Sequence, residues 1–467
     1  MEMFSAPDHI FRAYDIRGIV GKDLLPHTVL YCSAIFANIV EENGGNLVAA
    51  SGDVRVSTPS LLYAATSGIM ATGMDVVLAH PLPIPTFNYM VWSNDDIDGG
   101  AYITASHNPP EYNGVRFRRG DGTGFSAENI EIKRRFFEGK IRLAGWKSYG
   151  TCMLVDVKEI IDDYAGFVLD RAPPSERKLR IVIDCKHGAA NLVAPVLMAN
   201  HETLIVNGVI DGSFPTGMPD PLHGDVSLIM DVVRSAKADM GVAYDGDGDR
   251  AAFFDEEGRL VPAEVVGLFL AENLLRSGDC IIYNVMCSSI IRRRAEEMGL
   301  KTMECKVGDV FVAEAAKKYR AKLCVEESYH FFLPLYGFYY DDSMFVSLIM
   351  ANILSQKRIR LSAIRKKYGE IHVIRDNIEV DDRVKFSVVE KFKEWATHNY
   401  EDVSTIDGVK IYFEDSSFLA RPSNTEPLIR IMAEASSKEK ALELLKHMKR
   451  RILDIISNIR PTEPEPP

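Results

Sequence analysis

The chain has 467 residues, of which 46% are hydrophobic and 26% charged, as is usual for globular proteins, and its length predicts several domains. The net charge of −12, from 54 basic and 66 acidic side chains, argues against sequence-independent nucleic-acid binding, which needs a basic surface. We find no long uncharged apolar run and no apolar signal-peptide core near the N-terminus, so we expect no membrane span and a cytoplasmic location.

The first half of the chain alternates predicted helices with short apolar strands. Helical spacing at 28–42 and 60–72 is interleaved with strands at 46–51, 75–79 and 100–104. A second cycle has strands at 179–185, 203–206 and 239–244 and a helix at 189–198. A third has helices at 261–276 and 288–298 and strands at 279–284 and 323–327. Strands separated by helices indicate βαβ units with parallel or mixed sheets.

The pattern changes after about residue 365. Residues 373–380, 408–413 and 428–433 are typical of paired strands, and 438–458 is typical of a long helix. We therefore predict an α/β protein of three consecutive α/β domains with mixed sheets, at 1–150, 151–254 and 255–365. A C-terminal α+β domain follows at 366–460, and 461–467 is expected to be a disordered tail. The seven scattered cysteines, without a CxxC pair, are expected to be reduced core thiols.

Four polar loops follow or adjoin predicted strands, where α/β sheets bind ligands. The strongest chemical pattern is DGDGDR at 245–250. Its carboxylates, Asp245, Asp247 and Asp249, alternate with glycines and can converge on one hard cation such as Mg²⁺. A solvated turn or a calcium loop are the alternatives, but an EF-hand would need flanking helices, and here a strand precedes the loop.

The other three patterns are weaker when each is taken alone. TASHNPP at 104–110 offers Ser106 as a nucleophile or phosphate carrier, with His107 beside it, but it also suits an ordinary turn. RPSNT at 421–425 supplies several donors for a phosphate dianion, or forms a polar turn at a strand end. FRAYDIRG at 11–18 presents Tyr14 and Arg17, which either reach a phosphate or form a surface pair.

Together and in this order, FRAYDIRG, TASHNPPEYNG, DGDGDR and RPSNTEPLIRI resemble the α-D-phosphohexomutase superfamily, in its phosphomannomutase/phosphoglucomutase and phosphoglucosamine mutase branches. The resemblance covers nearly the whole chain and implies four domains around a central cleft. It implies that hexose 1-phosphate and 6-phosphate are interconverted through a phosphoserine and a bisphosphorylated sugar. It also implies one Mg²⁺ per chain, a phosphosugar as the binding partner, and a sugar 1,6-bisphosphate as activator.

The resemblance assigns a role to each matching residue. Ser106 corresponds to the phosphoserine, and Asp245, Asp247 and Asp249 correspond to the magnesium ligands, with Ser106 completing the metal site. By the same match, the catalytic neighbours of Ser106 are His107, Arg116 and Arg250. The substrate-binding positions are Tyr14, Arg17, Glu326, Ser328, His330, Arg421, Ser423, Asn424 and Thr425.

Three departures from the family pattern limit this transfer. The sugar-binding loop, usually GExSGH, is VEESYH at 325–330, so Val325 and Tyr329 replace glycines, and the usual Asp-Gly is Asp342-Ser343. Arg116 replaces a common lysine, and a guanidinium stays charged and cannot act as a base. The Tyr329 ring either narrows the sugar pocket or turns away into packing.

Two other functions stay open. One, suggested by the changed sugar loop, is a non-catalytic paralogue that binds phosphosugars, and the other is a metal-dependent phosphatase. The hexose preferred and the oligomeric state are left undecided by the sequence.

Overall fold

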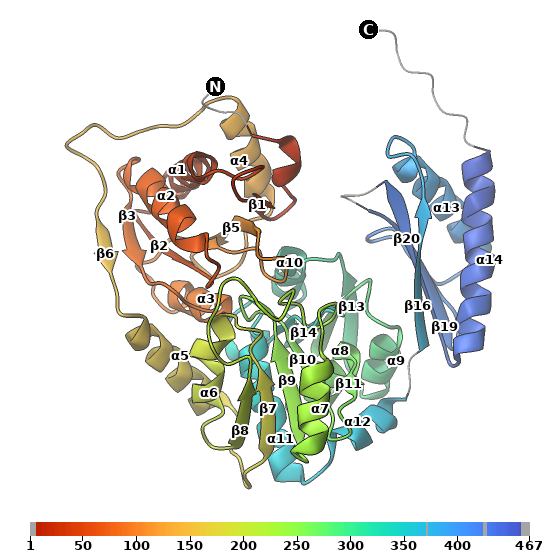
Figure 1. Ribbon diagram of the computed structural model, residues 1–467. Coiled ribbons are helices and arrows are strands. Elements are labelled where there is room, and N and C mark those ends of the chain that lie inside the picture. Colours follow the sequence, from red (N-terminus) through yellow and green to blue (C-terminus); the bar gives the residue numbers. More distant parts are fainter. Residues whose placement is uncertain (1–5, 370–371, 424–426, 459–467) are drawn as a thin grey trace.

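The computed structural model describes residues 6–369, 372–423 and 427–458. Figure 1 shows three α/β units in contact with one another and a fourth unit, in blue, at their side. The three α/β units, each built on its own sheet, and the antiparallel C-terminal unit agree with the predicted fold class. Of the helices in these ranges, none combines the length and apolar character needed to cross a membrane.

The first sheet has the strand order β1-β5-β4-β2-β3-β6, with β2, β3, β4 and β6 parallel and β1 and β5 completing a mixed sheet. Its strands are β1 (Ile16–Ile19), β2 (Leu47–Gly52), β3 (Asp75–Leu78), β4 (Gly99–Ile103), β5 (Tyr112–Arg119) and β6 (Cys152–Leu154). Its helical segments are η1 (Asp8–Ile10), α1 (Pro26–Glu42), α2 (Thr58–Met70), α3 (Ile84–Trp92) and α4 (Ala127–Phe137).

The second sheet has the order β11-β10-β9-β7-β8 and is also mixed. Its strands are β7 (Arg180–Asp184), β8 (Glu202–Val206), β9 (Met240–Tyr244), β10 (Ala251–Phe254) and β11 (Leu260–Val261). The helical segments are α5 (Val157–Arg171), η2 (Ala189–Leu192), α6 (Ala194–Leu197) and α7 (Ser227–Ser235). The single helix expected at 189–198 is wrong, because the chain breaks at Val193 and restarts with Pro195 in the first turn of α6.

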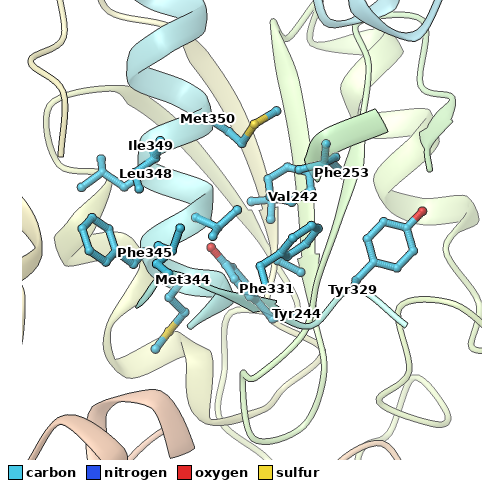
Figure 2. Close-up of a cluster of buried hydrophobic side chains, with 14 of the residues drawn as sticks. Val242, Tyr244, Phe253, Tyr329, Phe331, Met344, Phe345, Leu348, Ile349 and Met350 are labelled. Carbon is cyan, nitrogen blue, oxygen red and sulfur yellow. The ribbon is translucent and has the colours of Figure 1, made fainter. Parts of the chain in front are cut away.

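The third sheet has the order β13-β12-β14-β15. Its strands are β12 (Cys280–Asn284), β13 (Lys301–Cys305), β14 (Leu323–Val325) and β15 (Phe331–Phe332). Its helical segments are α8 (Ala263–Leu274), α9 (Ile290–Glu297), α10 (Asp309–Tyr319), η3 (Pro334–Tyr336), α11 (Ser343–Lys357) and α12 (Leu361–Tyr368). The second and third units share one hydrophobic core, in which α11 is buried on all sides. Figure 2 shows Phe345 and Ile349 of α11 with Phe253 and Phe331.

The C-terminal unit is an antiparallel sheet in the order β16-β20-β19-β18-β17. The strands are β16 (His372–Glu379), β17 (Val403–Ser404), β18 (Val409–Tyr412), β19 (Ser416–Pro422) and β20 (Leu428–Ala435), with helices α13 (Lys385–Asn399) and α14 (Lys438–Ser457). This unit has its own core. The predicted tail at 461–467 lies outside the described residues. All seven cysteines are unpaired, but Cys152 is exposed on β6, so the expectation of core thiols is wrong for it.

Candidate active site

The acidic loop 245–249 begins where the buried strand β9 ends. Asp245, Asp247 and Asp249 are fully buried, and one ligand oxygen from each lies within 4.8 Å of the others. Gly248 has φ +82°, which favours glycine, and the Gly248 N–H donates to Asp245 Oδ1 at 3.0 Å. The backbone therefore turns all three carboxylates to one point.

The charge on this loop is not balanced by the protein alone. Burial, with repulsion from the neighbouring aspartates, raises the pKa of Asp245 well above its usual range and also raises the pKa of Asp247. Within the described structure, Asp247 Oδ1 and Asp249 Oδ1 are buried and have no hydrogen-bond partner. Unpaired buried carboxylate oxygens that converge on one point fit a small divalent cation, and an all-oxygen site suits Mg²⁺.

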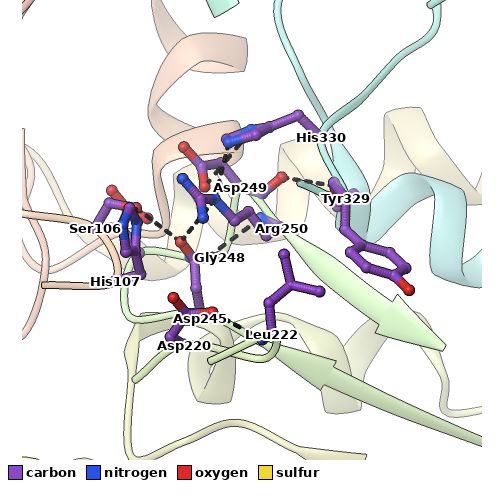
Figure 3. A network of polar contacts seen from close by, with 12 residues as sticks. Ser106, His107, Asp220, Leu222, Asp245, Gly248, Asp249, Arg250, Tyr329 and His330 are labelled. Atoms are coloured by element: carbon purple, nitrogen blue, oxygen red, sulfur yellow. Dashed lines mark hydrogen bonds and ion pairs between the residues drawn. The ribbon is translucent and has the colours of Figure 1, made fainter. Parts of the chain in front are cut away.

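Ser106 lies at the turn that follows β4 and faces this loop (Figure 3). Its hydroxyl donates to Asp245 Oδ2 at 2.9 Å, and His107 Nδ1 lies 3.2 Å from Ser106 Oγ. Burial, followed by the charges of Arg250 and Arg17, lowers the pKa of His107 well below its usual range, so this imidazole is neutral. Ser106 has φ +49°, an unfavourable conformation for a non-glycine residue that is found most often at functional sites.

Two buried arginines hold the Ser106 turn in this conformation. Arg17 donates to Ala105 O at 3.1 Å and to Asn108 Oδ1 at 2.8 Å. Arg55 donates to Ser106 O and to Asn108 O, each at 2.7 Å, and also to two further carbonyls of the same loop. Arg17, predicted to bind substrate, therefore contacts the loop itself. Arg55 was missed by the sequence analysis.

Arg116, on β5 of the first unit, is held between a carboxylate of the second unit and one of the third. One guanidinium nitrogen donates to Asp249 Oδ2 at 3.1 Å, and the other donates to Asp309 Oδ2, which also accepts from Arg118. The surrounding carboxylates raise the pKa of Arg116 well above its usual range despite its burial. Arg116 is thus a fixed positive charge beside the acidic loop.

The sugar loop 325–330 joins β14 to β15. Glu326 is buried, and its Oε1 accepts from Asn284 Nδ2 at 2.7 Å and from Gly308 N at 3.0 Å. Burial raises the pKa of Glu326 to about 7. Ser328 is partly exposed in the same loop.

The Tyr329 ring points away from the acidic loop and into the core (Figure 3). Its hydroxyl donates to Val261 O at 2.8 Å, and the side chain is 3% exposed. The hypothesis that this ring narrows the sugar pocket is therefore wrong. Tyr329 has φ +67°, so the position keeps a backbone conformation that favours glycine. Val325 has no such conformation and packs against Gly267 of α8.

His330 and Arg250 connect the sugar loop to the acidic loop. Arg250 Nε donates to His330 Nε2 at 2.9 Å, and His330 Nδ1 lies 2.6 Å from Asp341 Oδ2. A ring that accepts at Nε2 donates from Nδ1, so Asp341 fixes the orientation of this imidazole.

Three further predicted residues, Tyr14, Arg421 and Ser423, lie in the described part of the chain. Tyr14 lies against Gly308, with its Cε1 3.1 Å from where a β-carbon of that glycine would be. In the C-terminal unit, Arg421 Nε donates to Asp407 Oδ1 at 2.9 Å, and Ser423 is buried. Asn424 and Thr425 lie outside the described residues.

Besides Arg55, sequence reasoning missed Asp53, Thr104, Asp309 and Asp341. Thr104 Oγ1 lies within hydrogen-bonding distance of both Asp53 Oδ2 and Asp247 Oδ2 and accepts from Ser106 N. Asp53 and Thr104 both follow strands of the first sheet, β2 and β4, so the rule that ligand sites lie beyond strand ends could have found them. Asp309 and Asp341 carry no comparable signal in the sequence.

Four family models match the chain in order. They are described as phosphoglucomutase/phosphomannomutase alpha/beta/alpha domains I, II and III and the C-terminal domain, at residues 8–142, 162–258, 263–370 and 377–451. The chain is 33% identical over 438 residues to a probable phosphoglucosamine mutase of Methanopyrus kandleri, covering 93% of this chain and 95% of that protein. It is 32% identical over 446 residues to a phosphoglucomutase/phosphomannomutase of Thermococcus kodakarensis, covering 93% and 96%.

A solved structure gives the same result. A phosphoglucomutase/phosphomannomutase family protein from Burkholderia thailandensis superposes with a TM-score of 0.88 at 26% identity, covering 97% of this chain and 99% of that one. The chain therefore belongs to the phosphoglucomutase/phosphomannomutase family of α-D-phosphohexomutases, and these relatives support phosphohexomutase activity over a non-catalytic phosphosugar-binding protein.

Proposed function

We propose that this phosphohexomutase carries its phosphoryl group on Ser106 and interconverts the 1-phosphates and 6-phosphates of glucose, mannose or glucosamine. The main support for this assignment is the 2.9 Å hydrogen bond from Ser106 Oγ to Asp245 Oδ2. Beside it lie two buried carboxylate oxygens, Asp247 Oδ1 and Asp249 Oδ1, that lack hydrogen-bond partners. A phosphoryl group on Ser106 would lie at the point where those carboxylates converge.

In the forward half-reaction, a free hydroxyl of the sugar attacks the phosphorus atom on Ser106. The bond from phosphorus to Ser106 Oγ breaks as the bond to the sugar oxygen forms, giving a bisphosphorylated sugar. The bisphosphorylated sugar then turns over in the site. In the second half-reaction, Ser106 Oγ attacks the phosphorus of the other phosphoryl group and the bond from that phosphorus to the sugar oxygen breaks, so serine is rephosphorylated and the product is the isomeric monophosphate. A free sugar 1,6-bisphosphate would phosphorylate Ser106 by the same step and act as activator.

Asp245, Asp247 and Asp249 would hold one Mg²⁺, which when bound neutralises charge on the phosphoryl group and on the departing serine oxygen. Arg116 and Arg250 would add positive charge beside the same group. A guanidinium cannot accept the sugar hydroxyl's proton. The groups here that can accept one are the imidazole of His107 and the carboxylate of Glu326.

The sugar would lie between this centre and the C-terminal unit. Glu326, Ser328 and His330 would bind its hydroxyls, with Tyr14 and Arg17 at the phosphoserine side. Arg421, Ser423, Asn424 and Thr425 would bind the phosphate that does not react. Guanidinium and hydroxyl groups are suitable phosphate donors.

A coupled assay with glucose 1-phosphate, mannose 1-phosphate and glucosamine 1-phosphate, each with a trace of its 1,6-bisphosphate, tests the proposal. We expect conversion to the 6-phosphate with little release of inorganic phosphate, and the three rates identify the preferred sugar. Stoichiometric phosphate release would indicate a phosphatase instead. Binding of all three sugars without conversion would indicate a non-catalytic protein.

A further inference from the structure

The turn 306–308, between β13 and α10, contacts the sugar loop, the first unit and the C-terminal unit. Its Gly308 N–H donates to Glu326 Oε1 at 3.0 Å. The Tyr14 ring of the first unit lies against Gly308, whose φ of +125° is accessible to glycine alone. The Val307 N–H donates to Asp407 Oδ2 of the C-terminal unit at 3.3 Å.

The second oxygen of Asp407 contacts the proposed phosphate-binding arginine. Asp407 Oδ1 accepts from Arg421 Nε at 2.9 Å, so a single carboxylate joins Arg421 to the turn that supports Glu326. Asp407 is also closely confined. The next residue, Gly408, has φ +88°, and a β-carbon there would lie 2.4 Å from Ala420 O, next to Arg421 on β19.

An ion pair that joins the third and C-terminal units elsewhere is more exposed than the contacts of Asp407. Arg292 of α9 pairs with Asp402 at 3.0 Å, with 36% and 52% of the two side chains exposed. Asp407 and Arg421 are 20% and 17% exposed. Asp402 contacts neither Arg421 nor the turn 306–308 in any described hydrogen bond, which makes it a matched control.

We propose that Asp407 is a positioning residue that fixes the span between Arg421 and Glu326, and so selects the length of the phosphosugar. This inference rests on the proposed function. The phosphate held by Arg421 and the oxygen that reacts at Ser106 lie at opposite ends of the sugar. A fixed span therefore favours hexose phosphates over pentose phosphates, whose phosphate-bearing carbons are separated by one carbon fewer.

The test compares Asp407→Asn with the control Asp402→Asn, using glucose 1-phosphate and ribose 1-phosphate as substrates. For Asp407→Asn we expect kcat/KM for glucose 1-phosphate to fall about tenfold, mainly through KM, as for loss of a hydrogen bond to a charged group. The ratio of kcat/KM for the hexose to kcat/KM for the pentose should fall about threefold or more. The substitution loosens a span that fits the longer sugar phosphate, so the hexose loses more than the pentose. Asp402→Asn should change both quantities less than twofold.

The inference is overturned if Asp407→Asn behaves like Asp402→Asn, or if it lowers kcat and leaves KM and the hexose-to-pentose ratio unchanged. Should Asp407→Asn not fold, Asp407→Glu keeps the charge but lengthens the side chain, and it must shift the same ratio. Calorimetry on Ser106→Ala protein, with and without the Asp407 change, gives the ratio of the Kd values of the two sugar phosphates without turnover. If the wild-type protein binds both sugars but converts neither, the proposed function is wrong, and this Kd ratio still decides the role of Asp407.

Discussion

At the scale of single residues, the three aspartates of the acidic loop converge as a cation site requires, and their buried charge lowers the stability of the folded protein. A carboxyl group whose pKa is raised in the folded state stabilises that state at low pH, and the contribution is lost as pH rises through the folded pKa. Asp245 and Asp247 both have raised pKa values, so at neutral pH the metal-free loop is destabilising. A bound divalent cation would reverse this effect.

We therefore predict that Mg²⁺ raises the melting temperature of the wild-type protein, by the equivalent of about 2.7 kcal/mol at one hundred times its Kd. Asp247→Asn should lose most of this response, while the melting temperature of its metal-free form stays level or rises. Thermal unfolding with Mg²⁺ and with chelator measures both, and Asp231→Asn, at an exposed surface pair, is the control. An equal response to Mg²⁺ in Asp247→Asn and wild type would exclude this site.

Glu326 gives a second prediction, on pH. Its pKa of about 7 means that the carboxylate, which would accept hydrogen bonds from sugar hydroxyls, is lost as pH falls below 7. KM for the sugar phosphate should therefore rise by up to about tenfold between pH 7.5 and pH 6. Glu326→Gln, which cannot ionise, should show a high KM that is flat over this range. A KM profile in the variant as steep as in the wild type would assign the dependence to another group.

At the scale of elements, the packing of β14 against α8 explains how the chain accepts valine in its sugar loop. A β-carbon at Gly267 would lie 2.5 Å from Val325 Cγ2, so the missing side chain on α8 leaves space for Val325. The Val325 side chain is fully buried. The valine thus fills the core behind the loop and does not enter the site.

This pairing predicts that Gly267→Ala destabilises the protein by about 1–3 kcal/mol, as overpacking does. Adding Val325→Ala should recover part of that loss, with a coupling of about 0.5–3 kcal/mol in a double-mutant cycle. Gly166→Ala in α5 is the control, because a β-carbon there meets nothing within 4 Å, and it should stabilise by about 1 kcal/mol through helix propensity. Additive effects at positions 267 and 325, measured by denaturant unfolding, would refute the pairing.

Many of the strands, and the helices α1, α2, α8, α9 and α14, could be predicted from sequence, because each is a short apolar run or an amphipathic repeat between turn residues. The long helices α5, α11 and α13 were not predicted. The Asp245 to Asp249 loop could be predicted because its ligands are consecutive in the chain. Arg55 could not be assigned to the Ser106 turn, since the hydrogen bond joining them spans 51 residues. The direction of the Tyr329 ring was also open, because it depends on the Val261 carbonyl, 68 residues away.

At the scale of the whole molecule, the C-terminal unit is joined to the third unit by a small apolar cluster of Val285, Leu419 and Met432 and by buried polar contacts. Lys410 of β18 is 1% exposed and donates to Val285 O at 2.9 Å and Cys287 O at 2.7 Å. Tyr412 of the same strand donates to Glu304. Periodicity placed a strand at 408–413 but gave no sign that Lys410 would be buried between two units, because that depends on the partner surface.

We predict that Lys410→Met destabilises the protein by about 3–5 kcal/mol, because it leaves two buried carbonyls without their donor and removes the ion pair with Glu304. The C-terminal unit has its own core, so calorimetry should show it unfolding as a separate transition at lower temperature. Lys449→Met, which removes a partly exposed pair within that unit, should change stability by less than about 1 kcal/mol. A single unshifted transition in Lys410→Met would contradict this role.

The proposed mechanism depends on Ser106 carrying the phosphoryl group that is exchanged with the sugar. Intact-mass analysis of the purified protein, followed by peptide mapping, detects this group. We expect a species heavier by one phosphoryl group, with the modification on the peptide that contains Ser106, and its removal on incubation with a hexose monophosphate. Ser106→Ala should lack both this species and sugar-phosphate turnover. If Ser106→Ala protein converts hexose 1-phosphate at the wild-type rate, Ser106 is not the phosphoryl carrier.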